Sequence, residues 1–178
     1  MNFRHHTKND SQTIVLLFAS VFAASEGESE GALISQLAKE MFEKSDEHDL
    51  FNCVAEDYGQ IIGSVFFSRL AFDSGIEAFI LAPVAVHSDH QGKGIGQALI
   101  NFGLKELKDR GVSIALTYGD PRFYSRVGFR HISHETVRAP FELSQPEGWL
   151  GQSLVGNSME TLSGRCTCVE ALCNPAYW

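Results

Sequence analysis

A glycine-rich turn between an apolar run and an amphipathic helix is the feature that most constrains how this chain folds. The apolar run, residues 79–86, predicts a buried strand that Pro83 interrupts, and a polar turn over residues 87–90 follows it. Three glycines then occur within residues 92–96. The next segment predicts a helix because its apolar residues recur at helical spacing, at Ile95, Leu99, Phe102 and Leu107.

This order of elements predicts a binding site for a phosphate-bearing cofactor. The first N–H groups of a helix have no partner within it, and the helix dipole adds partial positive charge. Glycine permits positive φ and close approach. The phosphate loop of nucleotide hydrolases does not fit, because Lys93 precedes Gly94 and no Ser or Thr follows at the required place. The dinucleotide pattern fails at its third glycine, where Gln97 stands in a mid-chain unit.

The loop instead resembles the acetyl-CoA loop of the GNAT superfamily of N-acetyltransferases. The resemblance is carried by the pattern Gln91-x-x-Gly94-x-Gly96 after the Pro-Val-Ala-Val segment 83–86. A second block, GDPRFYSRVGF at residues 119–129, resembles the family's second motif, a short helix that carries a tyrosine and ends in Gly-Phe. The two blocks have the expected order and spacing. The resemblance covers about residues 1–130 well and 131–178 loosely.

The resemblance implies an α/β (α+β) fold of the GNAT-like acyl-CoA N-acyltransferase type. In such a fold a mixed, mostly antiparallel central sheet carries helices on both faces and contains a splayed parallel strand pair. Pro83 cannot donate a hydrogen bond to a neighbouring strand, so it predicts a bulge that separates its strand from strand 113–118. These two strands should be parallel, because a helix connects them.

The resemblance also implies the roles of individual residues. Main-chain N–H groups of the loop would hold the pyrophosphate, and the strand beside the gap would hold the pantetheine arm. The expected cofactor-binding residues are Val84, Ala85, Val86, Gln91, Gly92, Lys93, Gly94, Ile95, Gly96 and Gln97. Tyr124 is the expected catalytic residue, a general acid for the departing thiolate, because a phenol with a pKa of about 10 is protonated at neutral pH. Lys93, Arg122 and Arg126 would contact the phosphates or be solvated surface charges.

The general base and the acceptor stay open at this point. Some family members carry a glutamate on the central strand, where this chain has Ile80. Possible relays through water are Glu77, His87, Asp120 and His131. The implied reaction is direct attack of a primary amine, on a small molecule or a protein, on acetyl-CoA in a ternary complex. Alternatives are transfer of a longer acyl group and a non-catalytic CoA-binding sensor.

Composition narrows the remaining choices. The 178 residues suit a single domain, residues 1–178, with a motif-bearing core at 1–130 and C-terminal strands at 131–178. A net charge of −8 argues against nucleic acid as partner and fits a cationic amine or simple solubility. The four cysteines, Cys53, Cys166, Cys168 and Cys173, lack the spacing of a zinc site, so no metal is expected. We expect a monomer or homodimer.

The N-terminus imitates a secretory signal peptide, with Arg4 and Lys8 before an apolar segment and small residues at 23–25. Asp10 interrupts that pattern, and the apolar positions have helical spacing. The segment therefore predicts the first helix of a cytoplasmic protein, too short to span a membrane. Before the glycine loop, the expected elements are a weak strand at 2–8, this helix from a cap at Asp10 or Ser11 to 24, a break at 26–31, a helix at 32–44, and strands at 51–56, 60–70 and 77–86. After the loop, we expect the loop helix to end at 110–111, followed by a strand at 113–118 and a short helix at 121–127. The last expected elements are strands at 129–138, 149–155 and 165–172.

Overall fold

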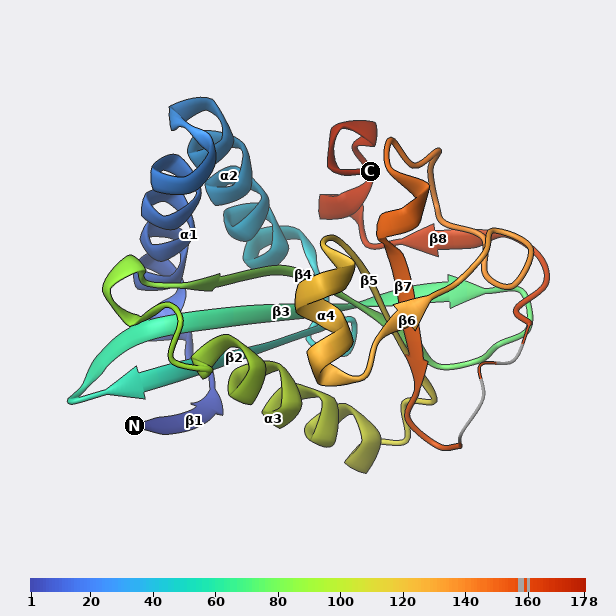
Figure 1. Ribbon diagram of the computed structural model, residues 1–178, viewed down its shortest axis with the longest axis horizontal. Helices are drawn as coiled ribbons and strands as arrows, with labels where there is room; N and C mark the ends of the chain where they lie inside the picture. The colour runs from blue at the N-terminus through green and yellow to red at the C-terminus, as the bar shows by residue number, and fades with distance from the viewer. Residues whose placement is uncertain (157–158, 160) are drawn as a thin grey trace. The chain divides into compact units, whose positions relative to one another are not determined.

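The computed structural model describes residues 1–156, 159 and 161–178 of the chain (Figure 1). Within these residues the strands are β1 Asn2–His5, β2 Leu50–Asp57, β3 Gln60–Phe72, β4 Ala78–Val86, β5 Ile114–Tyr118, β6 Arg130–His131, β7 Trp149–Ser153 and β8 Cys166–Cys168. The α-helices are α1 Ser11–Glu26, α2 Glu28–Lys44, α3 Ile95–Asp109 and α4 Pro121–Tyr124. Short 3₁₀ helices span Lys8–Asp10, Ser88–His90, Ser125–Val127, Pro146–Gly148, Glu170–Leu172 and Pro175–Tyr177.

The strands form a mixed sheet in the order β1-β2-β3-β4-β5-β7-β6, with β8 beside β3. The pairs β1–β2, β3–β8, β5–β7 and β6–β7 are antiparallel, whereas β4 and β5 are parallel. The predicted mixed, mostly antiparallel sheet with one parallel pair is therefore confirmed. The parallel register runs from Ala78 opposite Ile114 to Leu81 opposite Thr117.

The chain divides into two compact units. The first comprises Met1–Phe67 and Pro83–Gly103, and the second comprises Ser68–Ala82 and Leu104–Trp178. The expectation of a single acetyltransferase domain remains a prediction, as does the splay of the strands beyond Pro83. The predicted interruption at Pro83 is wrong, because β4 continues through this buried residue to Val86. Proline has a fixed φ near −65° and no N–H group. It can therefore stand within a strand at a position where its N–H is not needed for a hydrogen bond to a neighbouring strand.

Helices cover both faces of the sheet in the first unit. Phe66 and Phe67 are consecutive residues of β3, so their side chains point to opposite faces. On one face, Phe66 packs against Phe18 of α1 and Phe42 of α2, with ring centroids 5.6 and 4.9 Å apart. On the other face, Phe67 lies directly over Gly103 of α3. Both Phe66 and Phe67 are therefore buried beneath helices, one on each face of the sheet.

Helices α1 and α2 lie side by side, and the break between them is shorter than predicted (Figure 1). Only Gly27, with φ +102°, separates them. Gly31 is buried inside α2, where a Cβ atom would lie 2.7 Å from the main-chain oxygen of Ala19. The predicted break at residues 26–31 is therefore too long, because the glutamates of this segment favour a helix N-terminus and its second glycine allows close helix packing.

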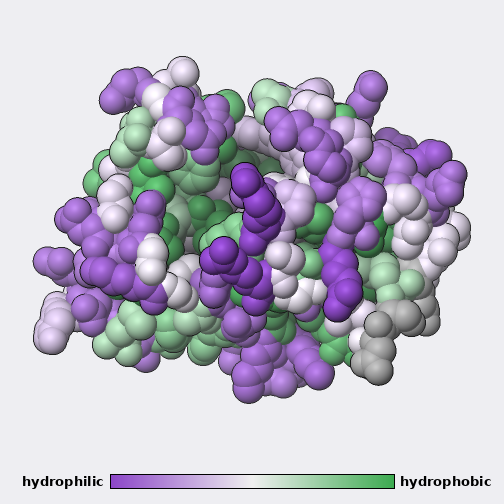
Figure 2. All heavy atoms as spheres, viewed as in Figure 1, coloured by the Kyte–Doolittle hydropathy of each residue, from purple (hydrophilic) through white to green (hydrophobic). Residues whose placement is uncertain are grey.

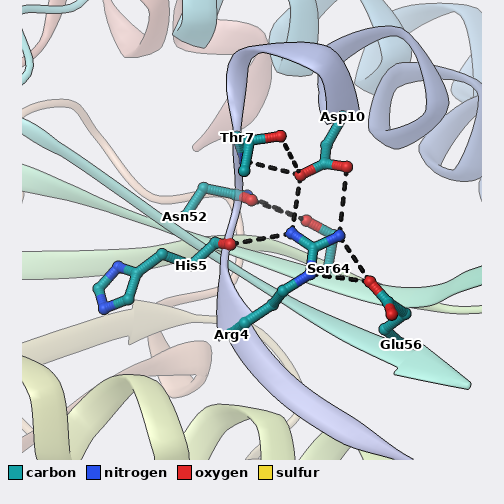
Figure 3. Close-up of polar contacts among 7 residues, drawn as sticks. All are labelled: Arg4, His5, Thr7, Asp10, Asn52, Glu56 and Ser64. Carbon is teal, nitrogen blue, oxygen red and sulfur yellow. Dashed lines mark hydrogen bonds and ion pairs between the residues drawn. The ribbon is translucent and has the colours of Figure 1, made fainter. Parts of the chain in front are cut away.

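Asp10 does not cap α1 with its side chain, contrary to the prediction. Its carboxylate instead accepts hydrogen bonds from Thr7 N at 2.6 Å and from Arg4 Nη1 at 2.8 Å (Figure 3). The Arg4 guanidinium also contacts Glu56 of β2 at 2.7 Å. A guanidinium between two carboxylates offers stronger, charge-assisted bonds than a helix cap does, so the cluster ties β1, the 3₁₀ turn and β2 together.

The second unit is built around β5, which pairs with β4 and β7. Trp149 begins β7, is fully buried and donates a hydrogen bond from Nε1 to Val137 O at 2.9 Å. The predicted strand at 129–138 is reduced to Arg130–His131, and the one at 165–172 to Cys166–Cys168 followed by a 3₁₀ turn. Tertiary contacts such as that of Trp149 hold these segments in irregular structure. None of the described helices is long and apolar enough to cross a membrane.

Candidate active site

The glycine loop has the backbone conformation that its sequence predicts. Gly92 has φ +73° and Gly94 has φ +77°, a region that residues with a side chain rarely adopt. A Cβ atom at either position would meet no other atom within 4 Å. These two glycines are therefore required for the turn itself, and the space beside them is open.

The main-chain N–H groups of the loop are available for an anion. The first hydrogen bond into α3 runs from Ala98 N to Gly94 O at 3.0 Å, so Ile95, Gly96 and Gln97 precede it. Among the described residues, the N–H groups of residues 92–94 also have no main-chain partner. Residues 91–94 are exposed, while Ile95 is buried and anchors the helix start. The loop thus presents a run of free donors at a helix N-terminus, which is an anion-binding arrangement.

The main-chain N–H and C=O groups of the strand before the loop point alternately to its two edges. His87 N donates to Ile62 O of β3 at 2.8 Å, so this residue faces β3. Because the orientation of main-chain groups alternates along a strand, Ala85 also faces β3, whereas the N–H and C=O groups of Val84 and Val86 point to the opposite edge. Their side chains are half-buried and that of Ala85 is buried.

The Gln91 side chain fastens the loop to this edge. Its Nε2 donates to Val86 O at 2.9 Å, which gives this carbonyl a partner and ties the strand to the loop. The sequence predicts only a main-chain role for Gln91. The identity of the residue in the motif does not show which group its side chain contacts. The Lys93 ammonium, expected near phosphate, donates to Asp89 O of its own loop at 2.9 Å. This hydrogen bond links two residues of the turn to each other.

Tyr124 lies in the second unit, at the end of α4. Asp120 caps this helix by accepting a hydrogen bond from Arg122 N at 2.9 Å, Pro121 occupies its first turn, and Gly128 with φ +93° ends the segment. The Tyr124 side chain is buried, and burial raises its pKa to about 12, while a hydrogen bond with Thr117 acts in the opposite direction. Its phenol is therefore protonated across the physiological range.

Two neighbours hold the Tyr124 side chain, and sequence reasoning missed both. A Cβ atom at Gly119 would lie 2.7 Å from Cε2 of the Tyr124 ring, so only glycine fits there. Thr117 is fully buried, and its Oγ1 donates to Leu81 O at 2.8 Å. The only local signal for Thr117 was a polar residue inside an otherwise apolar strand. The ring also meets Phe129 edge-on at 5.9 Å.

The candidate bases and remaining cations lie on the surface. Of the candidate bases, Glu77 forms an ion pair with Arg69, and Asp120 caps α4. The Nδ1 atom of His87 accepts a hydrogen bond from Asp89 N at 3.3 Å, and His131 is exposed on β6. Arg122 is 89% exposed and pairs with Asp120 at 3.3 Å, and Arg126 is exposed. Where α4 lies in Figure 1, Figure 2 shows strongly hydrophilic residues. Within the described residues, no cluster of three or more His, Cys, Asp or Glu side chains is arranged to hold a metal ion.

Comparison with known proteins relates this geometry to a family. Residues 48–131 match the family model described as an acetyltransferase (GNAT) domain. The uncharacterized N-acetyltransferase YjhQ of Escherichia coli K12 is 28% identical over 142 residues, which are 76% of this chain and 78% of that protein. The uncharacterized N-acetyltransferase YhbS of the same strain is 36% identical over 84 residues, which are 47% of this chain and 50% of that protein.

Solved structures agree over nearly the whole chain. The crystal structure of the GNAT family N-acetyltransferase YhbS from Escherichia coli, in complex with CoA, matches with a TM-score of 0.83 and 25% identity, over 97% of this chain and 92% of that one. A GNAT family acetyltransferase from Brucella melitensis, in complex with acetyl-CoA, has the same fold, with a TM-score of 0.69 and 24% identity over 96% of each chain. The domain match over residues 48–131, the two Escherichia coli relatives and the YhbS structure together support a GNAT-type, acetyl-CoA-dependent acyltransferase.

Proposed function

We propose that this protein transfers the acetyl group of acetyl-CoA to a primary amine, by direct attack of the amine in a ternary complex. The observation that carries the proposal is the run of free main-chain N–H groups at residues 92–97, in the glycine loop and the first turn of α3. The CoA complex of the similar Escherichia coli YhbS supports the choice of ligand. The acceptor is an amine of a small molecule or of a protein.

The loop fits a diphosphate by its shape and its donors. Gly92 and Gly94 leave open space where side chains would stand, and the amides that follow them carry the positive end of a helix dipole. The N–H and C=O groups of Val84 and Val86, on the edge of β4 that points away from β3, would bind the amide groups of the pantetheine arm. Because Gln91 already occupies Val86 O, the Val84 groups and Val86 N remain for this role.

The Tyr124 phenol is proposed as the general acid. Acetyl-CoA supplies an activated thioester, and its sulfur leaves as a thiolate that needs a proton. Burial keeps the phenol protonated, and Gly119 and Phe129 restrict its ring. No buried carboxylate stands on β4 at Ile80, so deprotonation of the amine falls to water or to an exposed group such as His87. We place the reaction in the cytoplasm, where acetyl-CoA is available.

The proposal is tested by measuring CoA release from acetyl-CoA with a panel of primary amines. Gly94→Val is the key variant, and Gly59→Val is its matched control. Gly59, in the turn between β2 and β3, has the same φ of +77° and equally open surroundings. Both substitutions force a side chain into left-handed backbone, at about 1–2 kcal/mol of stability each.

We expect the wild type and Gly59→Val to release CoA with at least one amine, and Gly94→Val to lose this activity. Equal activity in the two variants would show that the loop does not bind the cofactor. Binding of acetyl-CoA without release of CoA across the whole panel would reject catalysis and leave a sensor.

A further inference from the structure

Three of the four cysteines lie close together near the C-terminus, and these three are free thiols. Cys166 and Cys168 are the ends of β8, which pairs with β3 through Leu70–Phe72. Cys173 follows the 3₁₀ turn Glu170–Leu172, and its N–H donates to Glu170 O at 3.0 Å. This turn brings the chain back toward the end of β8.

The turn places two of the thiols next to each other. The Sγ atoms of Cys168 and Cys173 are 3.6 Å apart, and Cys173 Sγ is 3.8 Å from Cys168 O. Rotation of the two side chains can bring the sulfurs to the bonded distance of about 2.05 Å. Cys166 is a poorer partner, since it is buried two residues earlier on the strand and makes no sulfur contact with Cys173 in the described structure.

The two thiols differ in access. Cys173 is exposed, whereas Cys168 is half-buried, and burial raises the pKa of the Cys168 thiol to about 12. A reagent from solvent therefore meets Cys173 first, and Cys168 can react only with a partner already beside it. Its low fraction of thiolate is offset by this proximity, which makes the second step intramolecular.

We propose that Cys168 and Cys173 are a redox-modification site, which forms a reversible disulfide by exchange with a low-molecular-weight disulfide such as oxidised glutathione. The Cys173 thiolate attacks one sulfur of the oxidant, releases one thiolate and becomes a mixed disulfide. Cys168 loses its proton to solvent, attacks the Cys173 sulfur and releases the second thiolate. The protein loses two hydrogens and the oxidant is reduced to two thiols.

The disulfide would act on the packing of the C-terminal residue. The ring that it closes contains Leu172, whose carbonyl oxygen accepts a hydrogen bond from Trp178 Nε1 at 3.0 Å. Trp178 is buried, and its ring lies 6.2 Å from that of Trp149, centroid to centroid. The chain has only these two tryptophans. Oxidation should therefore change the intrinsic tryptophan fluorescence.

The test equilibrates the full-length protein with a series of ratios of oxidised to reduced glutathione, followed by acid quenching and N-ethylmaleimide labelling of the remaining thiols. Intact mass and peptide mapping then identify the bond. We expect one internal Cys168–Cys173 disulfide, reversed by dithiothreitol, and a fluorescence change with the same midpoint. Cys166→Ala and Cys53→Ala are controls that should keep both signals.

The order of attack is tested by two variants. Cys168→Ser should stop at a glutathione adduct on Cys173, and Cys173→Ser should form neither adduct nor disulfide under the same conditions. The proposal is overturned if the wild type accumulates a stable glutathione adduct on Cys173, if the bond forms with Cys166, or if Cys173→Ser still loses two hydrogens. None of these outcomes depends on acetyl transfer.

Discussion

Removal of a single oxygen tests the role given to Tyr124. Tyr124→Phe keeps the ring, which packs on Gly119 and Phe129, and removes the proton donor. We expect kcat to fall about 100-fold or more, with little change in KM for acetyl-CoA, because general acid catalysis acts on the departing thiolate and not on binding. The measurement is CoA release at saturating acetyl-CoA. Tyr58→Phe, at a fully exposed tyrosine, is the control, and an unchanged kcat in Tyr124→Phe would exclude the role.

At single residues, sequence reasoning succeeded where the backbone demands a residue type. Gly92, Gly94 and Gly128 have positive φ, and Pro121 occupies a first helical turn, so their local roles follow from their own chemistry. It was incomplete where a side chain finds a partner elsewhere. Gln91 reaches Val86 O, and Lys93 reaches Asp89 O, because the folded loop brings these carbonyls near. Side-chain partners of this kind depend on coordinates that a pattern does not contain.

At the level of elements, the Arg4 cluster joins β1, the first 3₁₀ turn and β2, and it predicts how stability changes with pH (Figure 3). The hydrogen bond from Arg4 lowers the pKa of Asp10 to about 2, from an ordinary value of 3.8. A carboxyl with a lowered pKa stabilises the fold above its unfolded pKa, and this contribution is lost as the pH falls from about 4 to 2. Because solvent screens this part-buried pair, we take its contribution to the free energy of unfolding as about 1 kcal/mol.

We therefore expect Asp10→Asn to reduce the free energy of unfolding by about 1 kcal/mol at pH 6. The difference from the wild type should shrink toward zero between pH 4 and pH 2, as measured by urea denaturation. Asp46→Asn is the control, since the Asp46 carboxylate is exposed and accepts a hydrogen bond from the nearby His48 N. A difference that stays constant down to pH 2 would show that the ion pair does not couple to folding.

The elements that were wrongly predicted share one cause. Gly31 lies inside α2 because its missing side chain lets α1 approach, and this contact is invisible in the segment itself. Residues 133–145 form irregular structure because Trp149 Nε1 bonds to Val137 O and Tyr118 Oη accepts from Gln145 N at 2.7 Å. Helices and strands with strong periodicity were found, whereas segments held by distant partners were not.

At the scale of the whole molecule, the fold was predicted by resemblance more than by periodicity. Two motifs, at residues 91–96 and 119–129, implied the mixed sheet, and the parallel register of β4 with β5 confirms its central feature. The parallel direction itself follows from the helix between the strands. The acceptor could not be predicted, because its binding depends on surfaces that no local motif describes. The loop geometry supports the expected cofactor and leaves the amine to experiment.

Binding to the loop should appear in the thermal stability of the whole protein. A ligand that binds only the folded state at 100 times its Kd stabilises it by about 2.7 kcal/mol. For a chain of 178 residues we therefore expect acetyl-CoA to raise Tm by about 5–10 °C. CoA should have a similar effect because it carries the same diphosphate, whereas pantetheine, which lacks it, should have much less.

The shift also separates binding by the loop from binding elsewhere. The free amides that follow Gly94 are displaced when a side chain forces this residue out of left-handed backbone, so Gly94→Val should lose most of the shift in Tm. Gly59→Val lowers the starting Tm by a comparable amount but leaves those amides in place, so it should keep the full shift. If Gly94→Val responds to acetyl-CoA as Gly59→Val does, or if pantetheine matches CoA, main-chain recognition of the diphosphate is rejected.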